Sequence, residues 1–319
     1  MQNKKHKKLR TFAILIAIAA IIIHIINKII VMSANFKEML EILNKKYFDS
    51  KFGKIYYTKH GKGSPILLIH DSLPGSSGYE WSRVEKLIAM DHTVYTIDLL
   101  GYGRSDKPGI TYTNFLYVQL INEFVEKVIK EKTNVISCGF SNSFVVMACN
   151  NNKDLFNKVM LINPPSLESL NQQLTLKDKI LSAIIKAPIF GTFLYHIIVS
   201  RETITTQFVE NLYYNPSQID RDIIESYYEA SHKGGYYAKY VYSSLISKKL
   251  NACLSNGIKN MTQEVVILSG ESELNASAIA NMYAELNPAI NIKTIKCSKH
   301  FPQIECPERF LSQVSSFFS

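Results

Sequence analysis

A series of short apolar, β-branched runs separated by longer stretches constrains the fold of this chain most strongly. The expected strands are Phe52–Thr58, Pro65–His70, Thr93–Leu99, Val135–Phe140, Val159–Asn163, Val265–Ser269 and Ile292–Cys297. Residues 114–130 and 307–318 carry helical periodicity. Near-continuous apolar strands that alternate with helices indicate a mostly parallel sheet with helices on both faces. We therefore expect an α/β fold.

The stretch between residues 164 and 264 breaks this alternation, because it is helical in pattern and rich in tyrosine. It predicts a helical cap at the edge of the sheet formed by the carboxyl ends of the strands. Its apolar part, Ile180 to Val199, is long enough to suggest a membrane span. Lys186 and Pro188 interrupt that part, which favours cap helices.

The N-terminus combines a basic tail with an apolar run from Phe12 to Met32. As a helix this run would be about 31 Å long, enough to cross the core of a bilayer. A cleaved signal peptide would look similar, but the segment is long and no clear cleavage site follows it. We favour a single-pass signal anchor. The basic residues before the span place the N-terminus in the cytoplasm and the remaining chain outside it.

These patterns divide the chain into five parts. Residues 1–10 form a basic cytoplasmic tail, 11–32 a transmembrane signal anchor and 33–45 a linker or helix. Residues 46–164 and 255–319 form the α/β core, and residues 165–254 form the helical cap.

Gly139-Phe140-Ser141-Asn142-Ser143 follows an expected strand and precedes an apolar helix. A strand, a sharp turn and a helix are the setting of a nucleophile elbow, in which small residues flank a reactive serine. Ser143 stands where the second glycine is usual, and both residues are small. Ser141 is the candidate nucleophile.

A serine nucleophile needs a base and a group that orients the base. His300 lies between the last expected strand and the last expected helix, which places it at the same sheet edge as Ser141. The loop after Val265–Ser269 supplies the acid, with Glu273 preferred and Glu271 as the alternative. The backbone amides of Ser72 and Asn142 are the candidate oxyanion donors.

From about residue 52 onward the chain resembles the α/β-hydrolase superfamily, specifically its capped esterase, lipase and peptidase-like members. The matching segments occur in the family's order: 67–70 with Trp81 downstream, 98–108, the elbow at Ser141, 270–273, and 300–302 with Glu305 and Pro307 after it. The resemblance implies a Ser–acid–His triad and a helical cap.

Three positions depart from the family pattern. Asp71 stands where glycine is usual and puts a carboxylate near the oxyanion hole, Glu273 replaces aspartate, and Ser143 replaces glycine. The family's dehalogenases use an aspartate nucleophile, so Ser141 argues against that activity.

The expected function is hydrolysis of an ester bond, with an amide bond as the less favoured choice, in a small lipophilic or aromatic substrate through an acyl-enzyme. The alternative is an inactive α/β-hydrolase-like protein that binds a ligand or partner. No metal or cofactor motif is present, so we expect neither. Much of the net charge of +9 belongs to the N-terminal tail, which disfavours nucleic-acid binding. The membrane is the expected partner, through the N-terminal helix, and the oligomeric state is open.

Overall fold

The computed structural model describes residues 2–41 and 45–319 and contains an eight-stranded sheet in the order β1-β2-β4-β3-β5-β6-β7-β8. The strands are β1 (Lys46–Ser50), β2 (Gly53–His60), β3 (Pro65–Ile69), β4 (Thr93–Ile97), β5 (Thr133–Cys138), β6 (Phe156–Ile162), β7 (Glu264–Gly270) and β8 (Asn291–Ile295). β2 runs antiparallel to both β1 and β4, and every other pairing is parallel. The expected α/β class, with its mostly parallel sheet, is confirmed.

The sheet divides the core into two apolar layers, because alternate side chains of a strand point to opposite faces. On β3, Leu67 and Ile69 pack into one layer, and Ile66 and Leu68 pack into the other. All four are fully buried, as the near-continuous apolar run in the sequence predicts. Parallel strands align their carboxyl ends, so the loops after β3, β5, β7 and β8 meet at one edge.

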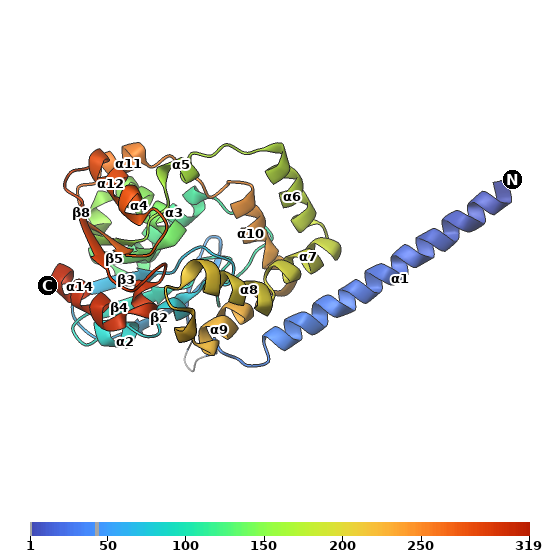
Figure 1. Ribbon diagram of the computed structural model, residues 1–319, viewed down its shortest axis with the longest axis horizontal. Helices are drawn as coiled ribbons and strands as arrows, with labels where there is room; N and C mark the ends of the chain where they lie inside the picture. Colours follow the sequence, from blue (N-terminus) through green and yellow to red (C-terminus); the bar gives the residue numbers. More distant parts are fainter. Residues whose placement is uncertain (1, 42–44) are drawn as a thin grey trace.

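Helices cover both faces of the sheet (Figure 1). The helices of the core are α2 (Glu85–Ile88), α3 (Asn114–Phe124), α4 (Asn142–Asn151), α11 (Ser255–Lys259), α12 (Ala276–Leu286), α13 (Pro302–Glu305) and α14 (Pro307–Phe318). Apolar residues of α3, α4 and α12 pack in the layer that contains Leu67. Those of α2, α13 and α14 pack in the layer that contains Leu68.

The segment between β6 and β7 is helical and lies between the sheet and the N-terminal helix (Figure 1). Its helices are α5 (Leu167–Leu170), α6 (Leu176–Lys186), α7 (Phe190–Ile198), α8 (Arg201–Gln207), α9 (Arg221–His232) and α10 (Lys239–Ile246). The helices α6 and α7 meet at a bend of 109°, so they do not form one straight span. The cap boundaries at 165 and 254 stay a prediction.

The N-terminal helix α1 (Gln2–Ala34) projects away from the rest of the chain (Figure 1). Its stretch Lys4–Ala34 is long and apolar enough to span a membrane. Its C-terminal part rests on the cap, where the Asn27 side-chain amide donates a hydrogen bond of 3.0 Å to the carbonyl oxygen of Ile189. Lys37, just after α1, forms an ion pair of 3.2 Å with Glu225 of α9. The predicted linker 33–45 includes residues 42–44, which lie outside the described residues.

Candidate active site

Ser141 lies in the tight turn that joins β5 to α4, at the carboxyl edge of the sheet. Gly139 takes the left-handed conformation that the turn requires, with φ of +56°, whereas Ser141 is helical at φ −64° and ψ −18°. The sharp bend expected at the nucleophile therefore falls two residues earlier, on glycine. The Ser141 side chain is fully buried, and its Oγ hydrogen-bonds to Ser72 Oγ at 2.8 Å.

His300 follows β8 and lies beside Glu273, which follows β7. The distance from His300 Nδ1 to Glu273 Oε1 is 3.2 Å. Glu271 lies elsewhere, because its Oε2 accepts a hydrogen bond of 3.3 Å from the Cys297 amide. Of the two carboxylates considered from the sequence, Glu273 is therefore the one that contacts the imidazole.

Two residues outside the predicted site hold the His300 loop. The Asn163 side-chain amide donates hydrogen bonds of 2.9 Å to the carbonyl oxygens of both Lys299 and His300. Glu305 Oε1 accepts from the Lys299 amide at 2.8 Å, and its Oε2 accepts from the amide of Tyr214 in the cap segment at 2.6 Å. The imidazole is thus fixed to the ends of the strands and to the cap together.

The second nitrogen of the His300 ring contacts Asp71 and not the candidate nucleophile. His300 Nε2 lies 2.8 Å from Asp71 Oδ2. Asp71 Oδ1 accepts hydrogen bonds from the backbone amides of Ser72 at 2.6 Å and Phe140 at 2.7 Å. The carboxylate lies against Gly139 so closely that a Cβ there would approach Asp71 to 2.2 Å, so only glycine fits. The part of the chain that the structure describes contains no hydrogen bond between Ser141 and His300.

The two predicted oxyanion donors are engaged in this arrangement. The Ser72 amide donates to Asp71, and the Asn142 amide donates to the carbonyl oxygens of Gly139 and Phe140 in the turn. Neither amide points to an open position beside Ser141, so their role as oxyanion donors stays a prediction. The sequence predicted that the Asp71 carboxylate lies near the oxyanion hole. It did not show that this carboxylate would bind the amides of Ser72 and Phe140 together with His300.

The two carboxylates determine the protonation of His300. Burial alone would lower the pKa of the imidazole, but hydrogen bonds and charges from Asp71 and Glu273 outweigh that effect and raise the pKa to about 10. At neutral pH the ring is therefore an imidazolium that donates from both nitrogens. In that form it cannot accept a proton from Ser141.

A fully buried carboxyl group, Glu80, connects this arrangement to the cap. Glu80 Oε2 accepts from the Asp71 amide at 2.9 Å, and its Oε1 accepts from the hydroxyl of Tyr227 on α9 at 2.6 Å. Burial first, and then the charge of Asp71, raise the pKa of Glu80 to about 7. Sequence reasoning missed this residue, and its only signal was a carboxylate directly before Trp81 in an otherwise uncharged turn.

His70 organises the neighbouring loops. Its Nε2 accepts from the Leu99 amide at 2.9 Å, which ties the end of β3 to the end of β4. The ring is fully buried, and burial lowers its pKa, so it stays neutral.

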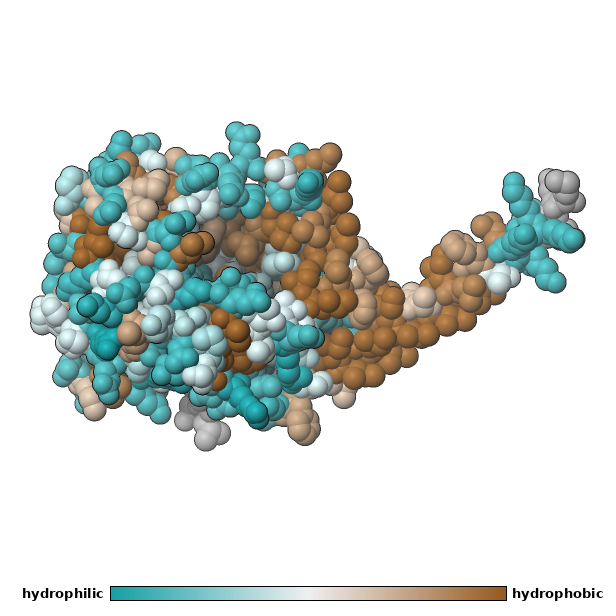
Figure 2. All heavy atoms as spheres, viewed as in Figure 1, coloured by the Kyte–Doolittle hydropathy of each residue, from teal (hydrophilic) through white to brown (hydrophobic). Residues whose placement is uncertain are grey.

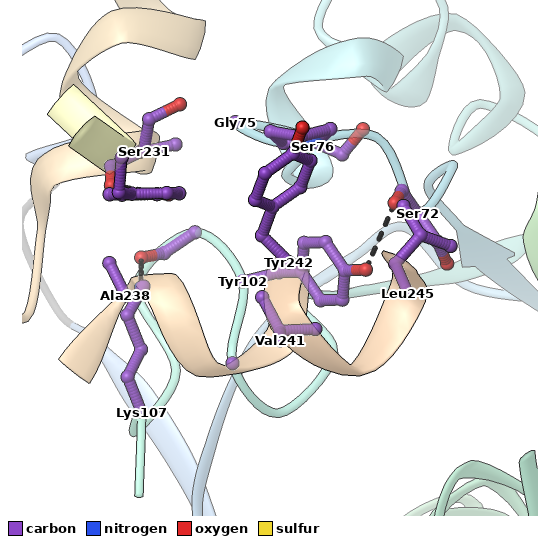
Figure 3. A pocket seen from close by; sticks show the side chains of 15 residues that line it. Ser72, Gly75, Ser76, Tyr102, Lys107, Ser231, Ala238, Val241, Tyr242 and Leu245 are labelled. Atoms are coloured by element: carbon purple, nitrogen blue, oxygen red, sulfur yellow. Dashed lines mark hydrogen bonds between the residues drawn. The ribbon is translucent and has the colours of Figure 1, made fainter. Parts of the chain in front are cut away.

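A small cavity separates this edge of the sheet from the cap (Figure 3). Ser72 and Tyr102 line it from the core, and Tyr195 and Tyr242 line it from the cap. The Tyr102 hydroxyl donates to the Ser72 carbonyl oxygen at 3.0 Å, which fixes the loop after β3. The volume open to water is about 10 Å³, enough for about one water molecule. In this arrangement the cavity is too small for an organic substrate.

Comparison with known proteins identifies the family. The family described as alpha/beta hydrolase fold matches residues 65–307. The chain belongs to this family. The sequence is 34% identical over 71 residues to the 2-hydroxy-6-oxo-6-(2'-aminophenyl)hexa-2,4-dienoic acid hydrolase of Metapseudomonas resinovorans. That match covers 22% of this chain and only 24% of the relative.

Solved structures share the fold over much more of their length. A serine hydrolase involved in carbazole degradation aligns with a TM-score of 0.70 at 19% identity, covering 86% of this chain and 98% of the other. A membrane phospholipase A described as a bacterial virulence factor aligns with a TM-score of 0.68 at 15% identity, covering 98% and 97%. At these identities the likeness establishes the fold.

Proposed function

We propose that this protein is a membrane-anchored serine hydrolase that cleaves an ester bond of a lipophilic molecule, with an amide bond as the less favoured choice. Ser141 Oγ attacks the carbonyl carbon while neutral His300 takes the Ser141 proton, and His300 then passes this proton to the departing alcohol or amine as the ester or amide bond breaks. Water, which gives a proton to His300, next hydrolyses the acyl-enzyme and releases the acid, and the proton returns to Ser141. Glu273 holds the imidazole and stabilises its cation. The contact of 3.2 Å between His300 and Glu273, at the sheet edge that carries Ser141, is the observation that supports this assignment most.

The contacts of Asp71 make the described arrangement a resting state in this proposal. The Asp71 carboxylate accepts hydrogen bonds from His300 Nε2 and from the Ser72 amide at the same time. A single displacement of the Asp71 carboxylate would free the base and one oxyanion donor together. The displacement would also move the negative charge of Asp71 away from the imidazolium, and this lowers the pKa of His300 toward the range of a general base.

The same contacts favour a second candidate function, in which Asp71 itself is the nucleophile. Asp71 Oδ1 accepts hydrogen bonds from two backbone amides, and Asp71 Oδ2 contacts His300. Oδ2 would attack an electrophilic carbon, expel the leaving group as an anion and form an ester on Asp71, which water would hydrolyse. The serine mechanism is preferred because Ser141 lies on the turn that carries the family's nucleophile.

The membrane assignment rests on α1. We propose that α1 crosses the membrane once as an uncleaved anchor, with the basic tail in the cytoplasm and the domain outside it. The structural likeness to a membrane phospholipase A, which extends over 98% of this chain, supports a substrate taken from or near the bilayer.

Ester hydrolysis by the full-length protein in detergent micelles tests the proposal. We expect turnover of 4-methylumbelliferyl esters, and Ser141→Ala should lower kcat/KM by at least about a thousandfold. Ser255→Ala, on α11 outside the site, is the control and should change little.

Mass spectrometry of the variant His300→Gln distinguishes the two candidate nucleophiles, Ser141 and Asp71. Because this variant cannot activate water, a covalent adduct on the nucleophile should persist. A stable alkyl adduct on the Asp71 peptide after exposure to an epoxide or haloalkane would favour Asp71. No ester turnover by the wild type, and no adduct on either residue, would support the inactive binding protein instead.

A further inference from the structure

A large cleft lies between the N-terminal helix and the cap, and it shares no lining residue with the cavity beside Ser72. Its volume open to water is about 590 Å³. α1 forms one wall through Asn27, Lys28 and Val31, and the α6–α7 bend forms another through Lys186 and Ile189. The hydrogen bond from Asn27 to the Ile189 carbonyl oxygen joins the two walls.

The lining of this cleft combines apolar surface with positive charge. Lys28, Lys186 and Lys239 contribute ammonium groups, and none of the described residues that line the cleft is acidic. Lys239 is almost fully buried, and its Nζ donates to the Ala187 carbonyl oxygen at 2.6 Å and the Thr192 hydroxyl at 3.0 Å. Two of its three protons are thus used within the protein, and the third remains for a ligand.

Buried polar atoms in the wall have no partner among the described residues. Both ring nitrogens of His196 and the side-chain oxygen of Asn27 make no hydrogen bond, although the two side chains are 2% and 6% exposed. Both residues line the cleft. Unpaired buried polar atoms are costly, so a ligand that hydrogen-bonds to them would be stabilised.

The surroundings of the cleft are apolar. Ile180, Leu181 and Ile184 on α6, and Phe190 and Ile197 on α7, have exposed side chains. Figure 2 shows these cap helices as a hydrophobic surface that continues onto α1. If α1 spans the bilayer, the residues around Asn27 lie near its outer surface, and the α6–α7 bend dips into the same layer. The cleft then opens to lipid.

We propose that this cleft binds an anionic phospholipid of the membrane, with its acyl chain against α1 and α7 and its headgroup at the three lysines. The inference rests on the membrane placement in the proposed function and is independent of catalysis. The bound lipid would lie next to the site cavity, because His196 and Lys239 line the cleft whereas their neighbours Tyr195 and Ala238 line the cavity. Movement of α7 and α10 would connect the two.

Native mass spectrometry of full-length Ser141→Ala, titrated with phosphatidylglycerol or phosphatidylcholine in detergent, tests this inference without interference from turnover. We expect one phosphatidylglycerol to bind more tightly than phosphatidylcholine. Lys28→Gln combined with Lys186→Gln should weaken phosphatidylglycerol binding by at least about fivefold, the factor that one lysine contributes toward anionic lipid.

The matched control is Lys8→Gln combined with Lys179→Gln, which removes one exposed lysine from each of the same two helices outside the cleft. It should bind phosphatidylglycerol like the parent. Equal affinity of the parent for the two lipids, or equal weakening by both double variants, would overturn the proposal. Ester hydrolysis by the wild type could still be present in that case, so the two proposals fail separately.

Discussion

At the residue scale, Asp71 controls three groups that a serine hydrolase needs. It contacts the base His300, it accepts from the Ser72 amide, and it lies against Gly139 in the nucleophile turn. A carboxylate with 2% side-chain exposure is retained only where its charge is compensated, and here the imidazolium and two amides compensate it. The contacts of Asp71 that stabilise this arrangement therefore also lower the reactivity of Ser141.

Asp71→Asn should make Ser141 reactive at lower pH. Removing the charge lowers the pKa of His300 from about 10, so a larger fraction of the imidazole is neutral at pH 7. Each unit of pKa changes that fraction about tenfold, and we expect fluorophosphonate labelling at pH 7 to accelerate by at least about tenfold. Labelling rates between pH 6 and 10 measure the shift. Glu271→Gln, which removes a carboxylate that does not contact His300, is the control, and an equal shift in both variants would contradict this explanation.

His300 should also make folding stability depend on pH. Its pKa is raised in the folded state, so its contribution is fully present below the unfolded value near 6.5 and is lost as pH rises through about 10. Between those values the wild type should lose on the order of a few kcal/mol relative to His300→Gln. Thermal unfolding of both proteins in detergent at several pH values checks this. A Tm difference that is constant with pH would exclude a raised pKa.

At the element scale, the cap and the sheet edge are coupled through buried contacts. Tyr227 on α9 reaches Glu80, and Glu80 reaches the Asp71 amide. The His300 amide also donates to the carbonyl oxygen of Leu212 in the cap segment at 3.1 Å. Movement of the cap therefore acts on the loop that carries Asp71 and on the loop that carries His300.

Tyr227→Phe should weaken this coupling without removing the ring from the core. Loss of a hydrogen bond to a charged or partly charged carboxyl group should cost about 1.5–3 kcal/mol of stability. We also expect faster fluorophosphonate labelling of Ser141, because Glu80, which holds the Asp71 amide, loses its hydrogen bond from Tyr227. Denaturant unfolding and labelling rates are the measurements. Tyr228→Phe, on the same helix, removes a hydroxyl with no hydrogen bond in the described structure, and it should alter neither quantity.

The strands of the core could be predicted because a buried strand requires a continuous run of apolar residues, which is visible in the local sequence. β3 and β5 are buried at every position, as a strand covered on both faces requires. β1 was missed because Lys46–Ser50 is mostly polar and lies at the sheet edge, where one face and one side remain open. The antiparallel direction of β2 was also not evident, since pairing direction depends on partners distant in sequence.

The site could be predicted only in part, for the same reason. Ser141, Glu273 and His300 each follow the carboxyl end of an expected strand, and this placement alone predicts that they meet at one edge of a parallel sheet. The choice between Glu273 and Glu271 depends on the turn after Gly270, whose backbone geometry the sequence does not specify. The contact between Asp71 and His300 joins residues 229 positions apart, so it follows from the folded sheet and not from a motif.

At the scale of the whole molecule, α1 and the neighbouring cap helices present one apolar surface, beside an α/β domain whose surface is mostly hydrophilic (Figures 1 and 2). In the proposed membrane placement, the site cavity, the cap and the cleft lie in this order between the core and the lipid. A hydrolase that takes its substrate from the bilayer would need this order.

The orientation of the chain can be tested in intact cells that carry a C-terminal tag. The basic residues before α1 predict that the domain faces outward, so external protease should remove the tag while a cytoplasmic marker stays intact. Moving the lysines of the tail to the other end of α1 should reverse the result. Complete protection of the tag in intact cells, with cleavage after lysis, would contradict the outward placement.

The most direct test of the central claim is the rate and position of fluorophosphonate labelling in the wild type and in Asp71→Gly, mapped by peptide mass spectrometry. The account predicts one adduct, on Ser141, that forms slowly in the wild type and at least about tenfold faster when Asp71 is removed. Absence of an adduct in both proteins, or an adduct that survives Ser141→Ala, would contradict it.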